Sequence, residues 1–557
     1  MTDLKIPVGI SDFAKIRNYD YYYVDKTGLI EELLENETAE VTLITRPRRF
    51  GKTMGMSMLA NFFDIRKDSK AMFAGLEISK NAALCKEWMN QWPVVFLSFK
   101  NIDGDKFSLA YQQMVYEIGL LYDSYSELLT SNKLSEDDKA LFLQLKRRTA
   151  NEIDVLRSIQ FLLSLLYKHY GKTVILLLDE YDVPLAKSSA HGYYPDMLNV
   201  IKSMMTTSLK DNNTLRFAVI TGCLRIAKES IFTGTNNFVS DTISSSHLNE
   251  YFGFTQADVD QILKDADCME HADDIKNWYD GYHFGNLDVY CPWDVMNYLR
   301  DLQRNPKAKP ASYWKNTSDN SIIRSFIDYA GHSISRKLEI LLSGGYILQR
   351  IEENLTYDYL HSSEENLWSI LYLTGYLTQA REEDLPEPLP EGSSALMIPN
   401  AEVREIFETT IQKWFDESAQ TWNRKALFDA VWSGDTETLT KEMNKLLRKT
   451  ISYHDYREDF YHAFLAGIFA GAGYEVDSNK EHGEGRSDVV VLDPEGDRVA
   501  IFEAKYSRTQ DAMPRDCAAA LQQIENRQYA KEFEEDYDSI LCYGIAFYKK
   551  RCLVQTK

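Results

Sequence analysis

The chain has 557 residues and a formal net charge of −22, from 62 Lys and Arg against 84 Asp and Glu. This length predicts several domains, and the 44% hydrophobic content is typical of globular proteins. No apolar run reaches the ~18 residues that cross a bilayer, and the N-terminus lacks the basic and apolar stretches of a secretory leader. Seven cysteines without CxxC spacing argue against structural zinc and disulfides and favour a cytoplasmic protein that contacts no membrane.

The acidic balance disfavours non-specific binding to nucleic acid, because such affinity comes from Lys and Arg that face phosphates. Residues 451–557 contain 13 Lys and Arg against 20 Asp and Glu, a net charge of −7. A nucleic acid held by this region would need a local basic patch, bound metal or another part of the chain.

Residues 1–245 alternate apolar segments of strand length with segments of helical periodicity. This order predicts a parallel sheet covered by helices on both faces. The strands are expected at Val41 to Arg46, Trp92 to Lys100, Thr173 to Glu180 and Thr214 to Gly222.

The segment RPRRFGKT, Arg46 to Thr53, follows the first of these strands and precedes a helix. This placement predicts a phosphate-binding loop in which Lys52 reaches the terminal phosphates of ATP and the Thr53 hydroxyl binds Mg²⁺. Arg46 stands where such loops usually have their first glycine, so we expect a different backbone path there. The remaining nucleotide contacts predicted in the loop are Arg48, Arg49, Phe50 and Gly51.

Two further strands supply polar residues at their carboxyl ends, where an open α/β sheet places its ligand. In LLLDEYD, we expect Asp179 to hold the Mg²⁺ water shell and Glu180 to orient the attacking water. Thr221 ends the next strand and is a candidate γ-phosphate sensor. Arg225 is either an arginine finger or a surface arginine, and the spacing does not distinguish the two.

The rest of the chain divides by pattern into three regions. Residues 246–345 form a helical lid-like region that includes the aromatic WYDGYHFG, and residues 346–450 form a mixed helical linker. In residues 451–557 the order helix, three strands, helix, strand predicts a compact α/β domain.

Asp488 and the triplet Glu503, Ala504 and Lys505 lie on two expected strands of this last domain. An acidic residue opening one strand and Glu-x-Lys closing the next is a recurring pattern of metal-dependent phosphodiesterases. We expect Asp488 and Glu503 to bind Mg²⁺ and Lys505 to position or deprotonate the water, because Glu503 and Lys505 share a strand face.

Taken together, RPRRFGKT, YVDKT, LLLDEYD, ITGCLRIAKESIFTGTNNF and WYDGYHF resemble the AAA-ATPase-like proteins of bacteria. In that family the ATPase is commonly followed by a PD-(D/E)XK nuclease-superfamily domain. The resemblance implies a P-loop NTPase parallel sheet with a helical lid, a mixed linker and a C-terminal restriction-endonuclease-like α/β domain. It also implies a further metal ligand on the first helix of the nuclease domain, for which Glu458 is the candidate; the alternative is a solvated helix face.

The leading hypothesis is a protein that binds ATP, and that we expect to hydrolyse it, coupled to a Mg²⁺-dependent nuclease, with DNA favoured over RNA. The alternative is a regulatory NTPase whose C-terminal domain binds nucleic acid or a protein partner without cutting, and a third is an ATPase that only binds proteins. A homo-oligomer is also compatible with the sequence, since Arg225 could act within its own chain or on a neighbouring subunit.

Overall fold

The chain forms two compact units in a computed structural model. The first is made from Met1–Asp319 and Gly344–Ile406, and the second from Asn320–Ser343 and Phe407–Lys557. The structure describes residues 4–557 apart from 36–38, 227–237, 315–336, 339, 356, 358–362, 387, 421–424, 451–464, 466–468, 470–473, 479–480, 483–484, 487, 494–495, 535 and 550.

A five-stranded parallel sheet in the order β2-β3-β4-β1-β5 is the centre of the first unit. Its strands are β1 (Val41–Thr45), β2 (Val94–Ser98), β3 (Val174–Asp179), β4 (Leu215–Gly222) and β5 (Phe238–Asp241). Every residue of β3 is buried, as expected for a strand covered on both faces. Because the strands are parallel, their carboxyl ends share one edge, where Asp179 lies beside Ser98 in register.

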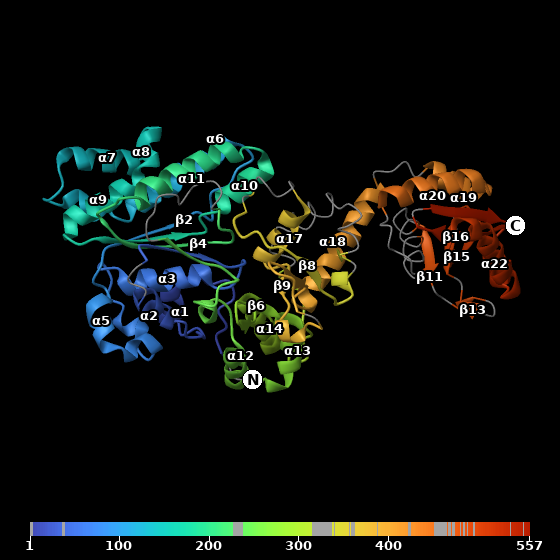
Figure 1. The fold of residues 1–557 in the computed structure, drawn as a ribbon, viewed down its shortest axis with the longest axis horizontal. Coiled ribbons are helices and arrows are strands. Elements are labelled where there is room, and N and C mark those ends of the chain that lie inside the picture. Colours follow the sequence, from blue (N-terminus) through green and yellow to red (C-terminus); the bar gives the residue numbers. More distant parts are fainter. Residues whose placement is uncertain are drawn as a thin grey trace. The chain divides into compact units, whose positions relative to one another are not determined.

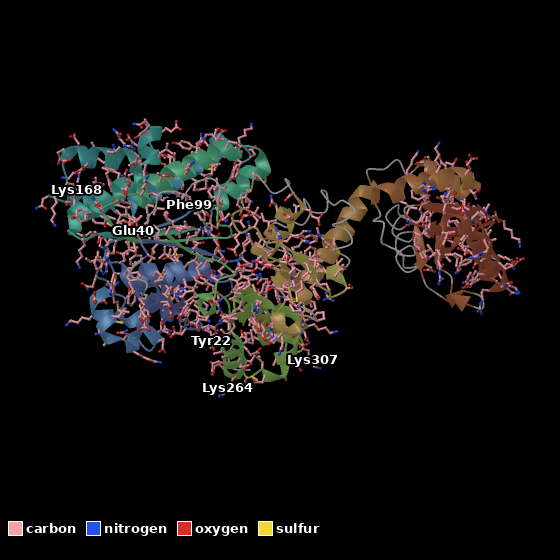
Figure 2. The ribbon with its side chains drawn as sticks, in the orientation of Figure 1. Tyr22, Glu40, Phe99, Lys168, Lys264 and Lys307 are labelled. Carbon is pink, nitrogen blue, oxygen red and sulfur yellow. The ribbon has the colours of Figure 1, made fainter. Side chains whose placement is uncertain are left out.

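Helices cover both faces of this sheet (Figure 1). On one face lie α1 (Phe13–Asn18), α2 (Gly28–Glu35), α3 (Lys52–Phe63) and α5 (Ala82–Trp88), with α4 (Lys70–Phe73) beside them. On the other lie α6 (Phe107–Asp123), α7 (Glu136–Lys146), α8 (Glu152–Leu156), α9 (Ser158–Tyr170), α10 (Val183–His191) and α11 (Tyr194–Leu209). Phe99, labelled in Figure 2, follows β2 and is fully buried between these layers.

A helical part of the first unit packs against the N-terminal residues. It contains α12 (Gln256–Asp265), α13 (Ala272–Tyr279) and α14 (Pro292–Arg304), with the short hairpin β6 (Tyr282–Phe284) and β7 (Leu287–Val289). Leu4, Ile6 and Val8 join its apolar core. Tyr22, labelled in Figure 2, donates a hydrogen bond of 2.8 Å to Asp265 at the end of α12.

The first unit ends with a small antiparallel sheet in the order β8-β10-β9, which the sequence did not predict in detail. It consists of β8 (Ile347–Gln349), β9 (Thr378–Gln379) and β10 (Ser394–Met397), together with α17 (Glu364–Leu373). The long helix α18 (Ala401–Gln420) follows.

The second unit is built on a mixed sheet in the order β11-β14-β15-β16-β17. Its strands are β11 (Glu475–Ser478), β14 (Val489–Asp493), β15 (Arg498–Tyr506), β16 (Ser539–Tyr548) and β17 (Arg551–Thr556). Strands β12 (Glu481–His482) and β13 (Gly485–Arg486) pair in a separate antiparallel sheet. The helix α22 (Met513–Asn526) packs on one face, where Val490, Val499 and Ile501 are buried. On the other face, α19 (Lys425–Ser433) and α20 (Thr436–Thr450) complete an apolar core with Val489, Phe502 and Tyr543.

The predicted α/β class is confirmed, with a parallel sheet near the N-terminus, a helical middle and a smaller α/β domain at the C-terminus. Strand β17 was not expected. The turn between β16 and β17 contains Lys549, which adopts a left-handed conformation with φ of 53°. Hairpin turns usually have Gly or Asn at such a position, so no signal in the sequence indicated this turn. Of the described helices, none is both long enough and apolar enough to cross a membrane.

Candidate functional site

The predicted phosphate loop connects β1 to α3, and two of its residues have positive φ. Gly51, just before α3, has φ of 87°, and Arg49 has φ of 75°. The Lys52 ammonium is buried inside the loop and donates to the carbonyl oxygens of Arg46 and Pro47, each at 3.0 Å. The lysine is therefore held at the centre of the loop by its backbone.

Arg46, at the position of the usual first glycine, acts as a buried anchor for the start of the loop. Its guanidinium forms an ion pair with Asp241 at the end of β5 and donates to Asn249 Oδ1 at 3.2 Å. It also lies over the rings of Phe252 and Phe284, at 5.5 and 5.7 Å. Burial lowers the pKa of Arg46, while the charge of Asp241 opposes that effect. Nothing in the sequence pattern marked Asp241 or Asn249, because both lie about 200 residues from the loop.

Asp179 is a fully buried carboxylate held by three hydroxyl groups. Thr53 and Ser98 donate to its Oδ2 at 3.0 and 3.1 Å, and Thr221 donates to its Oδ1 at 2.7 Å. Burial and the charge of Glu180 raise the pKa of Asp179, and the hydrogen bonds from Thr221 and Thr53 oppose this rise. The structure therefore brings together three residues predicted from separate motifs: Thr53, Asp179 and Thr221.

Glu180 follows Asp179 in a left-handed backbone conformation, with φ of 54°. Such a conformation is costly for a residue other than glycine and is often kept where it aims a functional side chain. Glu180 Oε1 lies 3.4 Å from Lys52 Nζ. Burial alone would lower the pKa of Lys52, but nearby Cys223, Glu180, Asp182 and Asp179 outweigh burial and raise it above its usual value, so the lysine stays charged.

Asp182 is a buried residue of the same segment for which the sequence suggested no role. Its Oδ2 accepts from the backbone N–H groups of Cys223 and Leu224 and from the Tyr357 hydroxyl, all at 3.0 Å. A Cβ on Gly222 would lie 2.6 Å from Asp182 Oδ1, so this position needs glycine. Asp182 thus fixes the turn after β4 beside Lys52. The only sequence signal was a second aspartate in LLLDEYD.

A cavity of about 320 Å³ opens beside the loop. Its polar end is formed by Gly51, Lys52, Thr53 and Glu180. Its other walls are mainly apolar and come from the N-terminal segment, α3 and the helical part: Pro7, Val8, Gly9, Ile10, Ile16, Tyr22, Tyr23, Val24, Leu29, Met54, Met58, Tyr251, Phe254, Pro292, Trp293 and Met296. Small-molecule sites have this size and this mixture of apolar walls with a few charged groups.

The aromatic WYDGYHFG segment supports the loop from the side. Phe50 is fully buried, with its ring 4.9 Å from that of Tyr282 and 5.1 Å from that of Phe284. Arg49 lies over the ring of Trp293 on α14 at 4.8 Å. Both Phe50 and Arg49 also line the cavity. The helical part therefore contacts the phosphate loop through the residues between Pro47 and Gly51.

Arg48 and Arg225 are not among the described residues that line this cavity. The Arg225 guanidinium lies 5.9 Å from the ring centre of Phe238 on β5. Burial lowers the pKa of Arg48, but its neighbours Cys223, Tyr357, Tyr376 and Asp182 outweigh that effect and raise it. Arg48 therefore belongs to the same neighbourhood as Asp182.

In the second unit, Asp488 lies next to Glu503 across two antiparallel strands. Val489 opens β14 and pairs with Phe502, so Asp488, directly before β14, lies opposite Glu503 on β15. Asp488 Oδ2 accepts a hydrogen bond of 2.7 Å from the Ala504 N–H. The Asp488 side chain thus accepts a hydrogen bond of the kind that a backbone carbonyl accepts within a sheet. This bond fixes the orientation of the carboxylate just before β14 begins.

Glu503 is 1% exposed, and its Oε1 accepts from Lys505 Nζ at 2.8 Å. Every second residue of β15 lies on the face of the sheet that α22 covers: Val499, Ile501, Glu503 and Lys505. Gly544 is the partner of Glu503 on β16, and a Cβ there would collide with the Cys517 carbonyl of α22. The helix thus approaches the sheet closely beside this carboxylate. Asp488, Glu503 and Lys505 come together as predicted from their spacing.

Two carboxylates with oxygen donors suit a hard divalent cation such as Mg²⁺, which binds through one or two carboxylates and keeps several waters. In the described part of the chain, no group of three or more His, Cys, Asp or Glu gathers in the manner of a complete metal cage. Glu458, the candidate third ligand, lies outside the described residues.

Comparison with known families agrees with both regions. Residues 7–232 match the family described as predicted AAA-ATPase, and residues 456–557 match the PD-(D/E)XK nuclease superfamily. The resemblance predicted from the sequence motifs is confirmed: an AAA-ATPase-like domain stands near the N-terminus and a nuclease-superfamily domain at the C-terminus.

The chain is also similar over nearly its whole length to one curated protein. It is 25% identical over 572 residues to an uncharacterized protein in the vnfD 5′ region of Azotobacter chroococcum mcd 1, covering 98% of this chain and 97% of that protein. The similarity therefore extends over both of the regions that match the two families.

Proposed function

We propose that the protein binds and hydrolyses ATP in its first unit and cleaves nucleic acid with Mg²⁺ in its second. The observation that carries the nucleotide half is the cavity of about 320 Å³, with Lys52, Thr53 and Glu180 at one end and apolar walls at the other. This division matches a ligand with a charged phosphate chain and a flat base.

The residues of the first site fit Mg²⁺ and ATP. Mg²⁺ offsets charge on the phosphates when it is bound. Thr53 and Asp179 are the residues that would hold the metal, since a hydroxyl and a carboxylate 3.0 Å apart both offer oxygen donors. Lys52 supplies a positive charge to the phosphates, and Glu180 accepts a proton from the attacking water. Thr221 keeps the Asp179 carboxylate in place.

The residues of the second site fit a metal-assisted phosphodiesterase. Mg²⁺ there supplies Lewis acidity and an activated water. Asp488 and Glu503 would hold it, while Lys505, 2.8 Å from Glu503, orients the water or offsets charge on the phosphate. Glu458 is proposed as a further ligand.

Arg48 and Arg225 contribute positive charge to the nucleotide site, Arg225 either within its own chain or across a homo-oligomer. The protein acts in the cytoplasm, with DNA favoured as substrate. The division of the chain at residues 245, 345 and 450 stays a prediction; α19 and α20, which precede residue 450, pack on the nuclease sheet and so belong with the second unit.

A regulatory NTPase that binds nucleic acid or a protein without cutting is the second candidate. The net charge of −7 in residues 451–557 favours the form of this candidate that binds a protein, because any protein that binds nucleic acid attracts the phosphates with basic side chains.

Cleavage assays on the full chain separate these functions. Single- and double-stranded DNA and RNA are incubated with Mg²⁺ or Mn²⁺, with and without ATP, beside the variants Lys52→Ala and Glu503→Gln. We expect the wild type to cut, Glu503→Gln to be inactive and Lys52→Ala to lose any dependence on ATP. Cleavage by Glu503→Gln at the wild-type rate would disprove the nuclease assignment. If cleavage and its ATP response survive Lys52→Ala, the coupling is wrong although the nuclease stands.

A further inference from the structure

Charged side chains in the second unit are divided between the two ends of its sheet. At the end that carries Lys505, β15 ends at Tyr506, β16 ends at Tyr548 and β17 begins at Arg551. The register joins them, since Tyr506 pairs with Phe547 and Tyr548 pairs with Arg551. The segment after β15 returns over this end and starts α22 at Met513.

Five cations gather at this end, which we call the basic end: Lys505, Arg508, Arg515, Lys549 and Arg551. Arg508, Arg515 and Arg551 are exposed. The carboxylates that accompany them along the same segments are Glu503, Asp511 and Asp516, of which Glu503 pairs with Lys505.

Hydrogen bonds tie two of the three exposed arginines, Arg515 and Arg551, to the segment that follows Lys505. Arg551 donates to Gln510 Oε1 at 3.0 Å, between Arg508 and α22. Asp516 accepts from Ser507 Oγ at 2.7 Å and from Arg515 at 3.1 Å. Arg508 lies directly after Ser507. The arginines therefore lie on or beside the segment that directly follows the Glu503–Lys505 pair.

The other end of the sheet is acidic. Around the turn between β14 and β15 and before β16, the described carboxylates are Asp493, Asp497, Asp536 and Asp538, and the end of α22 and the following residues add Glu525, Glu532 and Glu534. Two cations at this end form ion pairs with neighbouring carboxylates: Arg498 with Asp493 at 2.8 Å and Lys557 with Glu525 at 2.7 Å. Much of the negative charge of this region thus lies at the end away from Lys505.

From this division we propose that the basic end is the surface that binds the phosphate backbone of a nucleic acid and leads it to Asp488 and Glu503. The inference rests on the nuclease proposed above and names how that site holds its substrate. A local field decides such binding, because charges further apart than about 8–10 Å are screened at ordinary ionic strength. The carboxylates at the acidic end repel phosphates, so they disfavour binding of the nucleic acid at that end of the sheet.

The test measures binding without cleavage. Fluorescence anisotropy of short labelled single- and double-stranded DNA and RNA is followed with the full chain in EDTA, from about 50 to about 200 mM salt. The test variant combines R508Q, R515Q and R551Q. The matched control combines R527Q and K531Q, which remove cations beyond the other end of α22. Retained ATP binding and an unchanged circular dichroism spectrum establish that both variants are folded.

We expect the basic-end variant to bind about tenfold or more weakly and to lose roughly two to three units of the slope of log K against log salt, because each neutralised phosphate contributes about 0.9 to that slope. The control should match the wild type. If the basic-end variant binds as the wild type does, or if the control loses as much affinity, the inference is wrong; wild-type cleavage in Mg²⁺ then still supports the nuclease. If the wild type neither binds nor cuts, the proposed function fails as well.

Discussion

The two candidate sites place acidic side chains by different routes. In the first unit, Asp179 is held by hydroxyls from Thr53, Ser98 and Thr221, which come from three separate parts of the chain. In the second, Asp488 and Glu503 lie on adjacent strands joined by a short turn. A site built across one hairpin can be recognised from spacing, whereas a site built across a parallel sheet depends on the whole fold. The following predictions test that contrast.

Asp488→Asn should abolish cleavage while leaving the fold intact. Asparagine keeps an oxygen that accepts from the Ala504 N–H, but it removes the charge that would hold Mg²⁺. We expect the cleavage rate to fall about 100-fold or more, since even partners of metal ligands cost about 10- to 100-fold. The control is Asp493→Asn on the same strand, whose carboxylate pairs with Arg498 outside the site. If the two variants cleave at equal rates, the assignment of Asp488 as a metal ligand is wrong.

Glu180→Gln should separate ATP hydrolysis from ATP binding. The amide preserves the size of the side chain, but it cannot accept the proton of the attacking water, so the turnover number should fall about 100-fold or more. Affinity for ATP should change about twofold or less by this argument, because the phosphate contacts of Lys52 remain. Steady-state hydrolysis and binding of a fluorescent nucleotide measure the two quantities. If Glu180→Gln hydrolyses ATP at the wild-type rate, a group other than Glu180 accepts the proton of the attacking water.

Gly222→Ala tests how far the first site depends on distant contacts. The added Cβ would lie 2.6 Å from Asp182 Oδ1 and 2.8 Å from the Tyr181 ring, so we expect a loss of about 1–3 kcal/mol in the free energy of unfolding. Gly55→Ala, in the helix α3, is the matched control: its Cβ meets side chains at an ordinary 3.6 Å, and alanine favours the helix by about 0.5–1 kcal/mol.

Urea unfolding, followed at the transition that ATP shifts, measures both glycine variants. Opposite signs are expected for the two. A neutral Gly222→Ala would mean that the turn around Asp182 adjusts without cost.

The smallest expected effect is the response of nucleotide binding to pH. Burial and the charge of Glu180 raise the pKa of Asp179 above its ordinary value of 3.8, so this carboxylate takes up a proton at a higher pH than usual as pH falls. The charged form is the one that holds Mg²⁺. Between about pH 7.5 and about pH 5.5, Mg²⁺-dependent ATP affinity should therefore fall, by less than about tenfold. Binding measured in EDTA is the control, and an equal decline there would assign the effect to another group.

Much of both sites was predictable from residue type and position. Lys52, Thr53, Asp179 and Glu180 stand at strand ends or helix starts, where local sequence determines the backbone. Asp488, Glu503 and Lys505 follow from strand alternation over one hairpin.

The parts that the sequence could not predict depend on long-range packing. The apolar walls of the cavity include Pro7, Tyr23 and Trp293, which no local pattern joins to the loop. Tyr357 reaches Asp182 across 175 residues of chain. Arg225, predicted beside the nucleotide from its place after β4, lies over the ring of Phe238 and is not among the described residues that line the cavity, and no local pattern indicated that contact.

The buried Arg46 has a consequence for how such chains are recognised and redesigned. A search pattern that requires glycine at the start of the phosphate loop passes over this sequence, although the following Gly-Lys-Thr is intact. Restoring the common glycine would also remove the guanidinium that faces Asp241 and leave a buried carboxylate without its strongest counter-charge. Consensus substitution, usually a route to stabilisation, would here remove a support of the loop itself.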